Sequence, residues 1–331
     1  MPKKTNIVFM GTPEIAIPTL EALHNEYNVR AVVTIPDKPQ GRGQKLQPSP
    51  VKLKAIELGL KVLQPDNLKC QSFISSLNVL NPDIIIVFAF KFLPKEVYKV
   101  SNIATFNIHT SLLPEYRGAA PINWAIINGE SKTGLTSFIL NDKIDTGSII
   151  LQEEFIIPTN STAGELYNIM MEKAPSFTIK VCDQLLSGKY MLKQQDDNFV
   201  FSAPKLFKEN VEINWNKDAS AVINFINGCS PVPCAWTMWN KNKLQLLKAK
   251  VPSVDSIEKN IDNVSKLQLP GDFCISNKKL FVNCKIGIAE LIEIKLENKK
   301  AMAIKDFLNG YRGDLTGTFY QVKREENNSI L

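Results

Sequence analysis

Histidine and paired cysteine are scarce in this sequence, and their scarcity argues against a metal centre. The 331 residues include 2 His and 6 Cys. The cysteines are scattered, with no CxxC pair and no neighbouring His, as is typical of a reduced cytosolic chain. Cys229 and Cys234 are the closest pair, but no second pair or His follows at ligand spacing. We therefore expect no zinc site and no other bound metal.

Long apolar runs are also lacking. The basic N-terminus is followed by an apolar run from Ile7 to Met10 that ends at Gly11-Thr12-Pro13, which is not the pattern of a signal peptide. No run approaches the roughly 18 residues needed to span a membrane. The sequence therefore predicts a soluble protein that acts in the cytoplasm and has no membrane partner.

Phosphate-binding glycine patterns are missing as well. The first strand-to-helix turn, where a dinucleotide-binding fold carries G-x-G-x-x-G, has the single glycine Gly11. No Walker A sequence occurs anywhere in the chain. Neither NAD nor a nucleoside triphosphate is indicated, and we interpret Gly11 as part of a tight turn.

Short apolar strands alternate with helical stretches from Asn6 to about Leu186. This alternation is typical of an α/β fold with a doubly wound, mostly parallel sheet of the Rossmann-like kind. Helices are expected to begin near Ile15, Val51 and Gln71. The strands are predicted at Asn6–Met10, Val29–Thr34, Lys61–Leu63, Asp83–Phe88 and Ala104–Ile108.

The C-terminal part has a different pattern. Mixed polar residues and turn signals from Gly188 to Pro204 indicate a linker, and short strand-like segments follow it. They predict a small, mostly antiparallel barrel, with domain boundaries at 1–189, 190–204 (linker) and 205–331. The expected strands are Val211–Trp215, Leu244–Ala249, Asp272–Ser276, Lys279–Cys284 and Ile288–Leu296.

A polar cluster follows the predicted strand that ends at Ile108. Asn107 and His109 are two residues apart and so lie on one side of an extended backbone, at the edge of the sheet where α/β folds bind ligands. Asparagine can hold a developing oxyanion, and histidine can move a proton near neutral pH. Asp145, in a turn after the strand-like run Leu135–Leu140, could supply a carboxylate. Taken alone, His109 is more often a structural residue than a catalyst.

The surrounding motifs favour catalysis. Asn107, His109, Ser111-Leu112-Leu113-Pro114, Arg117-Gly118-Ala119-Ala120-Pro121 and Asp145-Thr146-Gly147 resemble, in this order, the folate-dependent formyltransferases. The segment from Pro36 to Lys52 is similar to that of the members acting on methionyl-tRNA. The resemblance covers nearly the whole chain and is weakest between Val251 and Leu269.

The resemblance implies transfer of a formyl group from 10-formyltetrahydrofolate to the α-amine of methionine on initiator methionyl-tRNA. Asn107 and His109 would stabilise the oxyanion, and Asp145 would orient the imidazole. It also implies an OB-like C-terminal domain, a fold that commonly binds nucleic acids. We expect a monomer. The residues expected to bind the folate are Ser111, Leu112, Leu113, Pro114, Phe88 and Leu93.

The resemblance implies that the loop from Pro36 to Pro50 contacts the acceptor end of the tRNA, with Arg42 as a contacting residue. Its prolines and glycines predict neither helix nor strand, and Lys38, Arg42 and Lys45 face one acid, Asp37.

The distribution of charge along the chain also supports an RNA partner. Residues 205–331 hold 19 Lys and Arg against 14 Asp and Glu, whereas residues 1–204 hold 20 against 19. A solvated lysine-rich surface would explain the excess equally well.

One departure from the family pattern occurs at Ala89-Phe90-Lys91, where formyltransferases usually have Ala-Tyr-Gly. Lys91 could face the glutamate tail of the folate or, as we expect, solvent.

Two other functions remain open. One is a different folate-dependent formyl enzyme, acting on a nucleotide sugar or hydrolysing formyl-folate. The other is an RNA-binding protein without catalysis, which the presence of Asn107, His109 and Asp145 disfavours.

Overall fold

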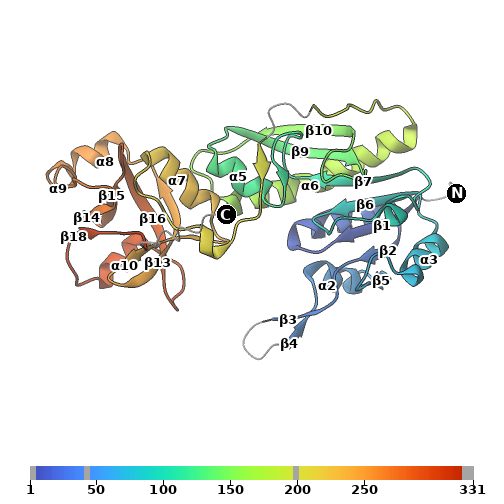
Figure 1. The fold of residues 1–331 in the computed structure, drawn as a ribbon, viewed down its shortest axis with the longest axis horizontal. Helices are drawn as coiled ribbons and strands as arrows, with labels where there is room; N and C mark the ends of the chain where they lie inside the picture. Colours follow the sequence, from blue (N-terminus) through green and yellow to red (C-terminus); the bar gives the residue numbers. More distant parts are fainter. Residues whose placement is uncertain (1–4, 41–44, 197–200, 323–331) are drawn as a thin grey trace, which may run out of the picture. The chain divides into compact units, whose positions relative to one another are not determined.

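The computed structural model describes residues 5–40, 45–196 and 201–322. The chain separates into two compact units (Figure 1). The first comprises residues 1–121, 132–156 and 167–203, and the second comprises residues 122–131, 157–166 and 204–331. The boundaries at 189 and 204 stay a prediction.

A seven-stranded sheet forms the centre of the first unit, in the order β10-β9-β7-β6-β1-β2-β5. β1, β2, β5, β6 and β7 are parallel, and β9 and β10 add antiparallel strands at one edge. The doubly wound, mostly parallel sheet is confirmed. The strands are β1 (Asn6–Gly11), β2 (Asn28–Val33), β5 (Val62–Leu63), β6 (Ile84–Phe88), β7 (Ala104–His109), β9 (Lys132–Ile139) and β10 (Ile149–Ile156).

Helices pack against this sheet, which explains why β6 is apolar along its whole length and β1 from Ile7 onward. On one face, Phe73, Leu77 and Leu80 of α3 form a core with alternate residues of β1, β2 and β6. The Tyr167 hydroxyl of α6 accepts a hydrogen bond from the backbone N–H of Ile15 in η1, and the hydroxyl of Tyr27, at the end of α1, donates to Asp183 of α6. The helices of this unit are η1 (Glu14–Ala16), α1 (Ile17–Glu26), α2 (Pro50–Glu57), α3 (Gln71–Leu80), α4 (Lys95–Tyr98) and α6 (Ala163–Ser187).

The loop after β2 corrects one prediction. β3 (Lys38–Gln40) and β4 (Lys45–Gln47) pair as an antiparallel ladder, although the prolines and glycines of this loop predict no strand. A two-stranded ladder has only edge strands, where a proline such as Pro39 is tolerated because one side of each strand needs no partner. Arg42 lies outside the described residues.

The second unit contains an antiparallel sheet in the order β12-β13-β16-β15-β14-β18, with β17 paired to β16. The expected antiparallel, barrel-like fold is confirmed. Its strands are β12 (Ala235–Trp239), β13 (Asn242–Lys250), β14 (Asp272–Ser276), β15 (Lys279–Asn283), β16 (Ile288–Leu296), β17 (Met302–Ala303) and β18 (Thr316–Thr318). Its helices are α5 (Pro121–Ile127), η2 (Lys208–Asn210), α7 (Ala219–Gly228), α8 (Val254–Glu258), α9 (Ile261–Val264) and α10 (Ile304–Gly310).

Two details of this unit differ from the prediction. Val211–Trp215 is not a strand, because its pairing with the sheet is limited to an isolated bridge between Glu212 and Trp236. The alternation of apolar and polar residues in this segment arises because Val211, Ile213 and Trp215 are buried in the core. β12 was not predicted, since it begins directly after a proline-rich turn. Within the described residues, no helix has both the length and the apolarity needed to cross a membrane.

Candidate active site

His109 is the last residue of β7, and both nitrogens of its ring point at oxygen atoms. Nδ1 lies 3.8 Å from Oδ2 of Asp145, and Nε2 lies 2.9 Å from the carbonyl oxygen of Tyr116. A carbonyl oxygen can only accept, so Nε2 is the protonated nitrogen in this contact. The side chains of His109 and Asp145 are 7% and 13% exposed. The structure therefore brings together two of the three predicted catalytic residues in a nearly closed site.

Asp145 lies in a tight turn after β9. Its φ of 54° is in the left-handed region, which is uncommon for a residue with a side chain. Oδ2 of Asp145 accepts a hydrogen bond of 3.0 Å from the backbone N–H of Gly118. Gly147 makes the turn possible, because a Cβ at this position would clash with the carbonyl oxygen of Ile139. The carboxylate is thus held toward His109 by backbone geometry as well as by a hydrogen bond.

The residues whose backbone contacts His109 and Asp145 belong to one short segment. Tyr116 has a φ of 61°, and Gly118 has a φ of 129°. β8 (Arg117–Gly118) pairs in parallel with β11 (Ser202–Ala203), which lies in the predicted linker. Strained backbone of this kind is often found at functional sites. The Tyr116 carbonyl and the Gly118 amide were not predicted as site groups, because backbone groups leave no signal in the sequence.

Asn107 lies two residues before His109 on β7 and is half-buried. The alternation of the strand places it on the same side as His109. Its amide makes no hydrogen bond with the residues that the structure describes, so it retains a free donor. Such a donor is what stabilisation of an oxyanion requires.

Hydrogen bonds hold the predicted folate-binding loop in place. Ser111 Oγ donates to the carbonyl of Glu115 at 2.6 Å, and the Leu113–Pro114 peptide bond is cis. Thr136 Oγ1 donates to the Ser111 carbonyl at 2.7 Å and accepts from Leu113 N at 3.1 Å. The side chains of Phe88, Leu93 and Leu113 are at most 3% exposed, whereas Leu112 and Pro114 are partly accessible. The folate assignments stay a prediction.

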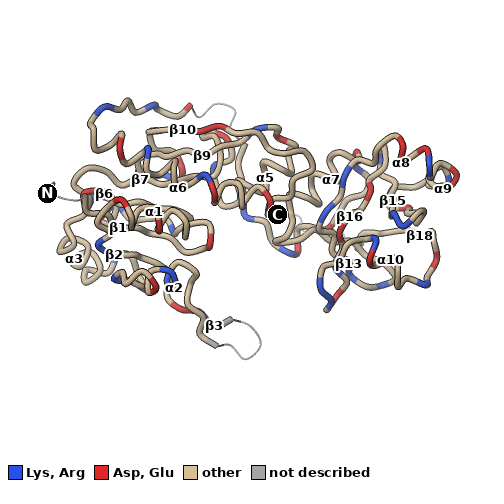
Figure 2. Tube along the Cα trace, turned by 180° about the vertical axis from the view of Figure 1, so that it is seen from behind, with Lys and Arg blue, Asp and Glu red and all other residues tan. Residues whose placement is uncertain are grey.

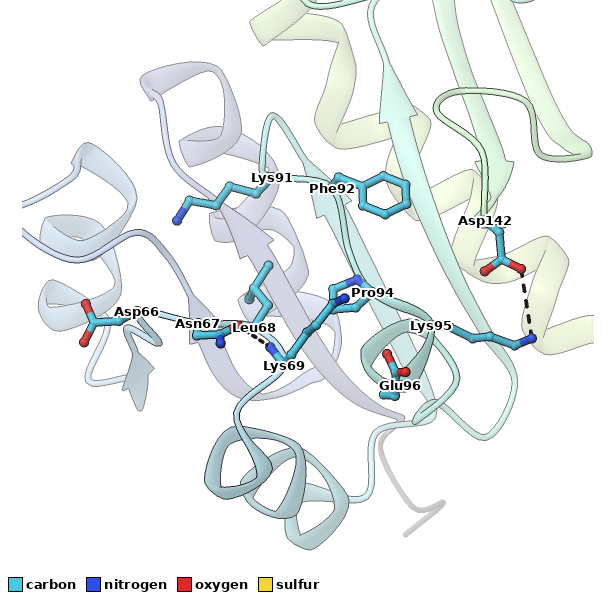
Figure 3. A pocket seen from close by; sticks show the side chains of 10 residues that line it. All are labelled: Asp66, Asn67, Leu68, Lys69, Lys91, Phe92, Pro94, Lys95, Glu96 and Asp142. Atoms are coloured by element: carbon cyan, nitrogen blue, oxygen red, sulfur yellow. Dashed lines mark hydrogen bonds and ion pairs between the residues drawn. The ribbon is translucent and has the colours of Figure 1, made fainter.

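A cavity of about 530 Å³ opens beside α4 in the first unit (Figure 3). Its lining is mainly charged, and Lys69, Lys91 and Lys95 supply the positive groups. Lys91 is exposed, as expected, and it also borders this cavity. None of Asn107, His109 and Asp145 lines the cavity. The remaining lining residues are Asp66, Asn67, Leu68, Phe92, Pro94, Glu96 and Asp142.

Acidic partners engage the lysines of this cavity unequally. Lys95 Nζ lies 4.0 Å from Asp142 Oδ2, and Figure 3 shows its side chain reaching toward that carboxylate. Asp142 also accepts a 2.7 Å hydrogen bond from Tyr98, and this bond, with burial, raises the pKa of Tyr98 to about 12. The Lys91 chain extends away from Asp142 in the same view. Lys91 is therefore the more available cation.

The predicted tRNA contacts are only partly described. Lys38 is exposed in β3, and Lys45 begins β4. Asp37, at the base of the hairpin, is bound by Lys52 at 2.7 Å and by Gln64 at 2.8 Å, and these hydrogen bonds lower the pKa of its carboxyl group. The charge of Asp37 is thus neutralised by residues of the unit itself.

Over residues 5–40, 45–196 and 201–322, no three His, Cys, Asp or Glu side chains gather as a set of metal ligands would.

Comparison with known proteins identifies the family. A formyl transferase model matches residues 5–182, and a model of the formyl transferase C-terminal domain matches residues 205–312. The chain belongs to the formyltransferase family. This formyltransferase is 42% identical over 310 residues to methionyl-tRNA formyltransferase of Flavobacterium johnsoniae, an alignment that covers 93% of this chain and 96% of the relative. It is 41% identical over 314 residues to that of Porphyromonas gingivalis strain W83, with the same coverage.

Solved structures show the same fold at greater distance. WlaRD, a sugar 3N-formyl transferase crystallised with dTDP and 5-N-formyl-THF, superposes with a TM-score of 0.64 at 20% identity. The superposition covers 90% of this chain and 99% of WlaRD. HypX from Aquifex aeolicus in complex with tetrahydrofolic acid gives a TM-score of 0.60 at 16% identity, over 94% of this chain and 50% of HypX. At these identities the likeness concerns the fold alone.

Proposed function

We propose that this formyltransferase moves the formyl group of 10-formyltetrahydrofolate to the α-amine of methionine on initiator methionyl-tRNA. The observation that carries this proposal is the 42% identity to a methionyl-tRNA formyltransferase along 93% of the chain. The proximity of His109 and Asp145 supports it, because these are the residues that the family resemblance assigns to catalysis.

In the proposed reaction, the neutral amine of methionine attacks the formyl carbon and forms a new C–N bond. The formyl oxygen then carries negative charge. Asn107, with its free amide, and His109 stabilise this oxyanion. When the intermediate collapses, the bond between the formyl carbon and the folate nitrogen breaks, and a proton on that nitrogen replaces the formyl group. Loss of one oxyanion donor typically slows such reactions about 10²- to 10³-fold.

Asp145 has two roles in this mechanism. Its carboxylate faces Nδ1 of His109 at 3.8 Å and so helps to orient the imidazole ring. It also assists removal of the proton that the attacking amine must lose. Both roles depend on the fixed turn around Asp145, and the contact with the Gly118 amide helps to maintain that turn.

We place the folate along Ser111, Leu112, Leu113 and Pro114, with its formyl group near Asn107 and His109. Its acidic glutamate tail would reach the cavity beside α4, where Lys91 is the cation proposed to bind a carboxylate among a lining of three lysines and three acids. Lys91 replaces the glycine usual in the family and supplies a cation there. No metal is needed for any step of this mechanism.

We place the tRNA acceptor end near the hairpin that bears Lys38, Arg42 and Lys45. In the second unit, basic positions recur along β13, at Lys243, Lys248 and Lys250, and in the connecting loops, among acidic ones (Figure 2). Their excess over acidic residues suits phosphate contacts. We further propose that the protein acts as a monomer in the cytoplasm.

A direct assay tests the function. The protein is incubated with 10-formyltetrahydrofolate and methionyl-tRNA charged on initiator tRNA, and the released amino acid is identified by mass spectrometry. We expect formylmethionine. Parallel reactions with a nucleotide-linked amino sugar and with water as the only acceptor test the two other formyl activities. Formylation of the sugar or release of formate, without formylmethionine, would overturn the proposal.

A further inference from the structure

A segment that the sequence marks only as a linker is attached to the candidate active site. We name residues 193–196 and 201–203 the connector. At one end, the backbone of Lys193 exchanges two hydrogen bonds with Ile149 of β10, at 2.8 and 2.9 Å. At the other end, Tyr116 N donates to the Phe201 carbonyl at 2.6 Å, and Ala119 N donates to the Ala203 carbonyl at 2.8 Å. The connector therefore holds the segment that includes Tyr116 and Gly118.

Gln195, in this connector, is half-buried and has its whole side-chain amide engaged. Nε2 donates to the carbonyl of Asp145 at 3.0 Å and to the carbonyl of Gly147 at 2.7 Å. Oε1 accepts from Nε and Nη2 of Arg117 at 3.0 and 2.7 Å. The orientation of the amide follows from its partners, because carbonyls only accept and a guanidinium only donates.

These contacts link the two groups that flank His109. Gln195 binds the backbone carbonyl of Asp145, and the Gly118 amide binds its carboxylate. Arg117, the residue before Gly118, binds the same Gln195. The left-handed backbone of Asp145 is intrinsically unfavourable, so contacts on its carbonyl oppose relaxation to another conformation. Without Gln195, the carboxylate would lose its fixed approach to Nδ1.

We propose that Gln195 is a positioning residue for formyl transfer, which holds Asp145 against His109 through the carbonyls of the Asp145–Gly147 turn. The inference rests on the proposed function. Its consequence is that the segment leading into residues 204–331 is itself a part of the catalytic apparatus, although Gln195 does not touch the substrates.

The test compares Gln195→Ala and Gln195→Glu with Gln194→Ala. Gln194 is the adjacent residue of the same type, but it is exposed and its amide reaches the Ser148 hydroxyl at 2.9 Å. Glutamate keeps the shape of glutamine and an acceptor for Arg117 but lacks the two donors. We expect both Gln195 variants to lose about 10- to 100-fold in kcat, since small misplacements of reacting groups have effects of this size. Both Gln195 variants should keep a KM for methionyl-tRNA within about twofold of wild type, and Gln194→Ala should keep its kcat within about twofold of wild type.

A spectroscopic measurement tests whether Gln195 positions the groups around His109. Its result does not depend on the general stability of the protein or on the proposed function. The chain contains 2 His, so ¹H–¹³C spectra show two sets of ring signals, and His24 on α1 serves as the internal reference. In the Gln195 variants the His109 signals should move while the His24 signals stay, with no comparable change in Gln194→Ala. If wild type lacks formyl transfer, the proposed function fails, and these signals still test the positioning. Unchanged His109 signals, or a Gln195→Glu variant with wild-type kcat, would overturn the inference.

Discussion

Oδ2 of Asp145 lies 3.8 Å from Nδ1 of His109, and the same carboxylate oxygen accepts the backbone N–H of Gly118 at 3.0 Å. The carboxylate thus connects the end of β7 with the segment whose Tyr116 carbonyl contacts the other side of the imidazole. A ring held between two acceptors is oriented before any substrate arrives. The predictions below test this arrangement and the surfaces around it.

His109→Ala and Asp145→Asn should each slow formyl transfer about 10²- to 10³-fold under single-turnover conditions, because both groups act mainly on the charged transition state. Folate binding, followed by titration calorimetry with a stable analogue, should persist in both. His24→Ala is the matched control and should behave as wild type. Near-normal single-turnover rates in either site variant would contradict the assigned mechanism.

Gly147→Ala should lower the free energy of unfolding by about 1–3 kcal/mol, the usual range for forcing extra atoms into a closely packed place. The added Cβ would meet the Ile139 carbonyl and displace the Asp145 turn. Gly310→Ala is the control, since a Cβ there has no neighbour within 4 Å. Urea unfolding measures both variants, and equal stability of the two would show that the turn accommodates a side chain.

Lys91→Ala should weaken binding of a triglutamyl folate more than that of the monoglutamyl form. We expect a loss of about two- to fivefold for the longer tail, the range typical of an exposed ion pair. Lys99→Ala provides the comparison, because Lys99 is exposed next to α4 but does not line the cavity. Calorimetric titration at low salt measures the affinities, and an equal loss for both folates would place the tail elsewhere.

Arg42→Ala and Lys38→Ala should weaken tRNA binding and leave folate affinity nearly unchanged, because these residues are proposed to contact phosphates. The logarithm of wild-type affinity for tRNA should fall with the logarithm of salt concentration, by roughly 0.7 to 0.9 per neutralised phosphate. Filter binding measures this slope, and Lys132→Ala, at an exposed position of β9, is the control. Salt-independent binding would remove the case for a basic RNA surface.

Cys70 should be the first thiol of the native protein to react with a disulfide reagent. It is exposed, and a hydrogen bond with the Ser72 hydroxyl lowers its pKa, so its thiolate is present at lower pH than usual. Burial raises the pKa of Cys182, Cys229 and Cys284 to about 12, and that of Cys234 and Cys274 to about 11. Cys70→Ser should remove the fast phase, and Ser72→Ala should move its pH midpoint upward. A fast phase that survives in Cys70→Ser would refute this assignment.

Much of the fold follows from local patterns in the sequence. The near-continuous apolar runs of β1 and β6 predict buried parallel strands, because both faces of such strands are covered by helices. The helix at Gln71 was predicted correctly, since its apolar residues recur at helical spacing. Asn107 and His109 share one side of β7 through the two-residue repeat of a strand, which requires no tertiary information.

Tertiary structure decided the rest. The hairpin of β3 and β4 forms although its prolines and glycines disfavour strands. The hydrogen-bonded pairing of the two strands outweighs the weak strand preference of residues such as Pro39. The approach of Asp145 to His109 depends on a left-handed turn and on hydrogen bonds from distant backbone. Gln195 carries no motif at all, and its place beside Asp145 arises only when the connector folds against the turn. A sequence displays side chains in order along the chain, whereas contacts of this kind depend on backbone atoms that every residue shares.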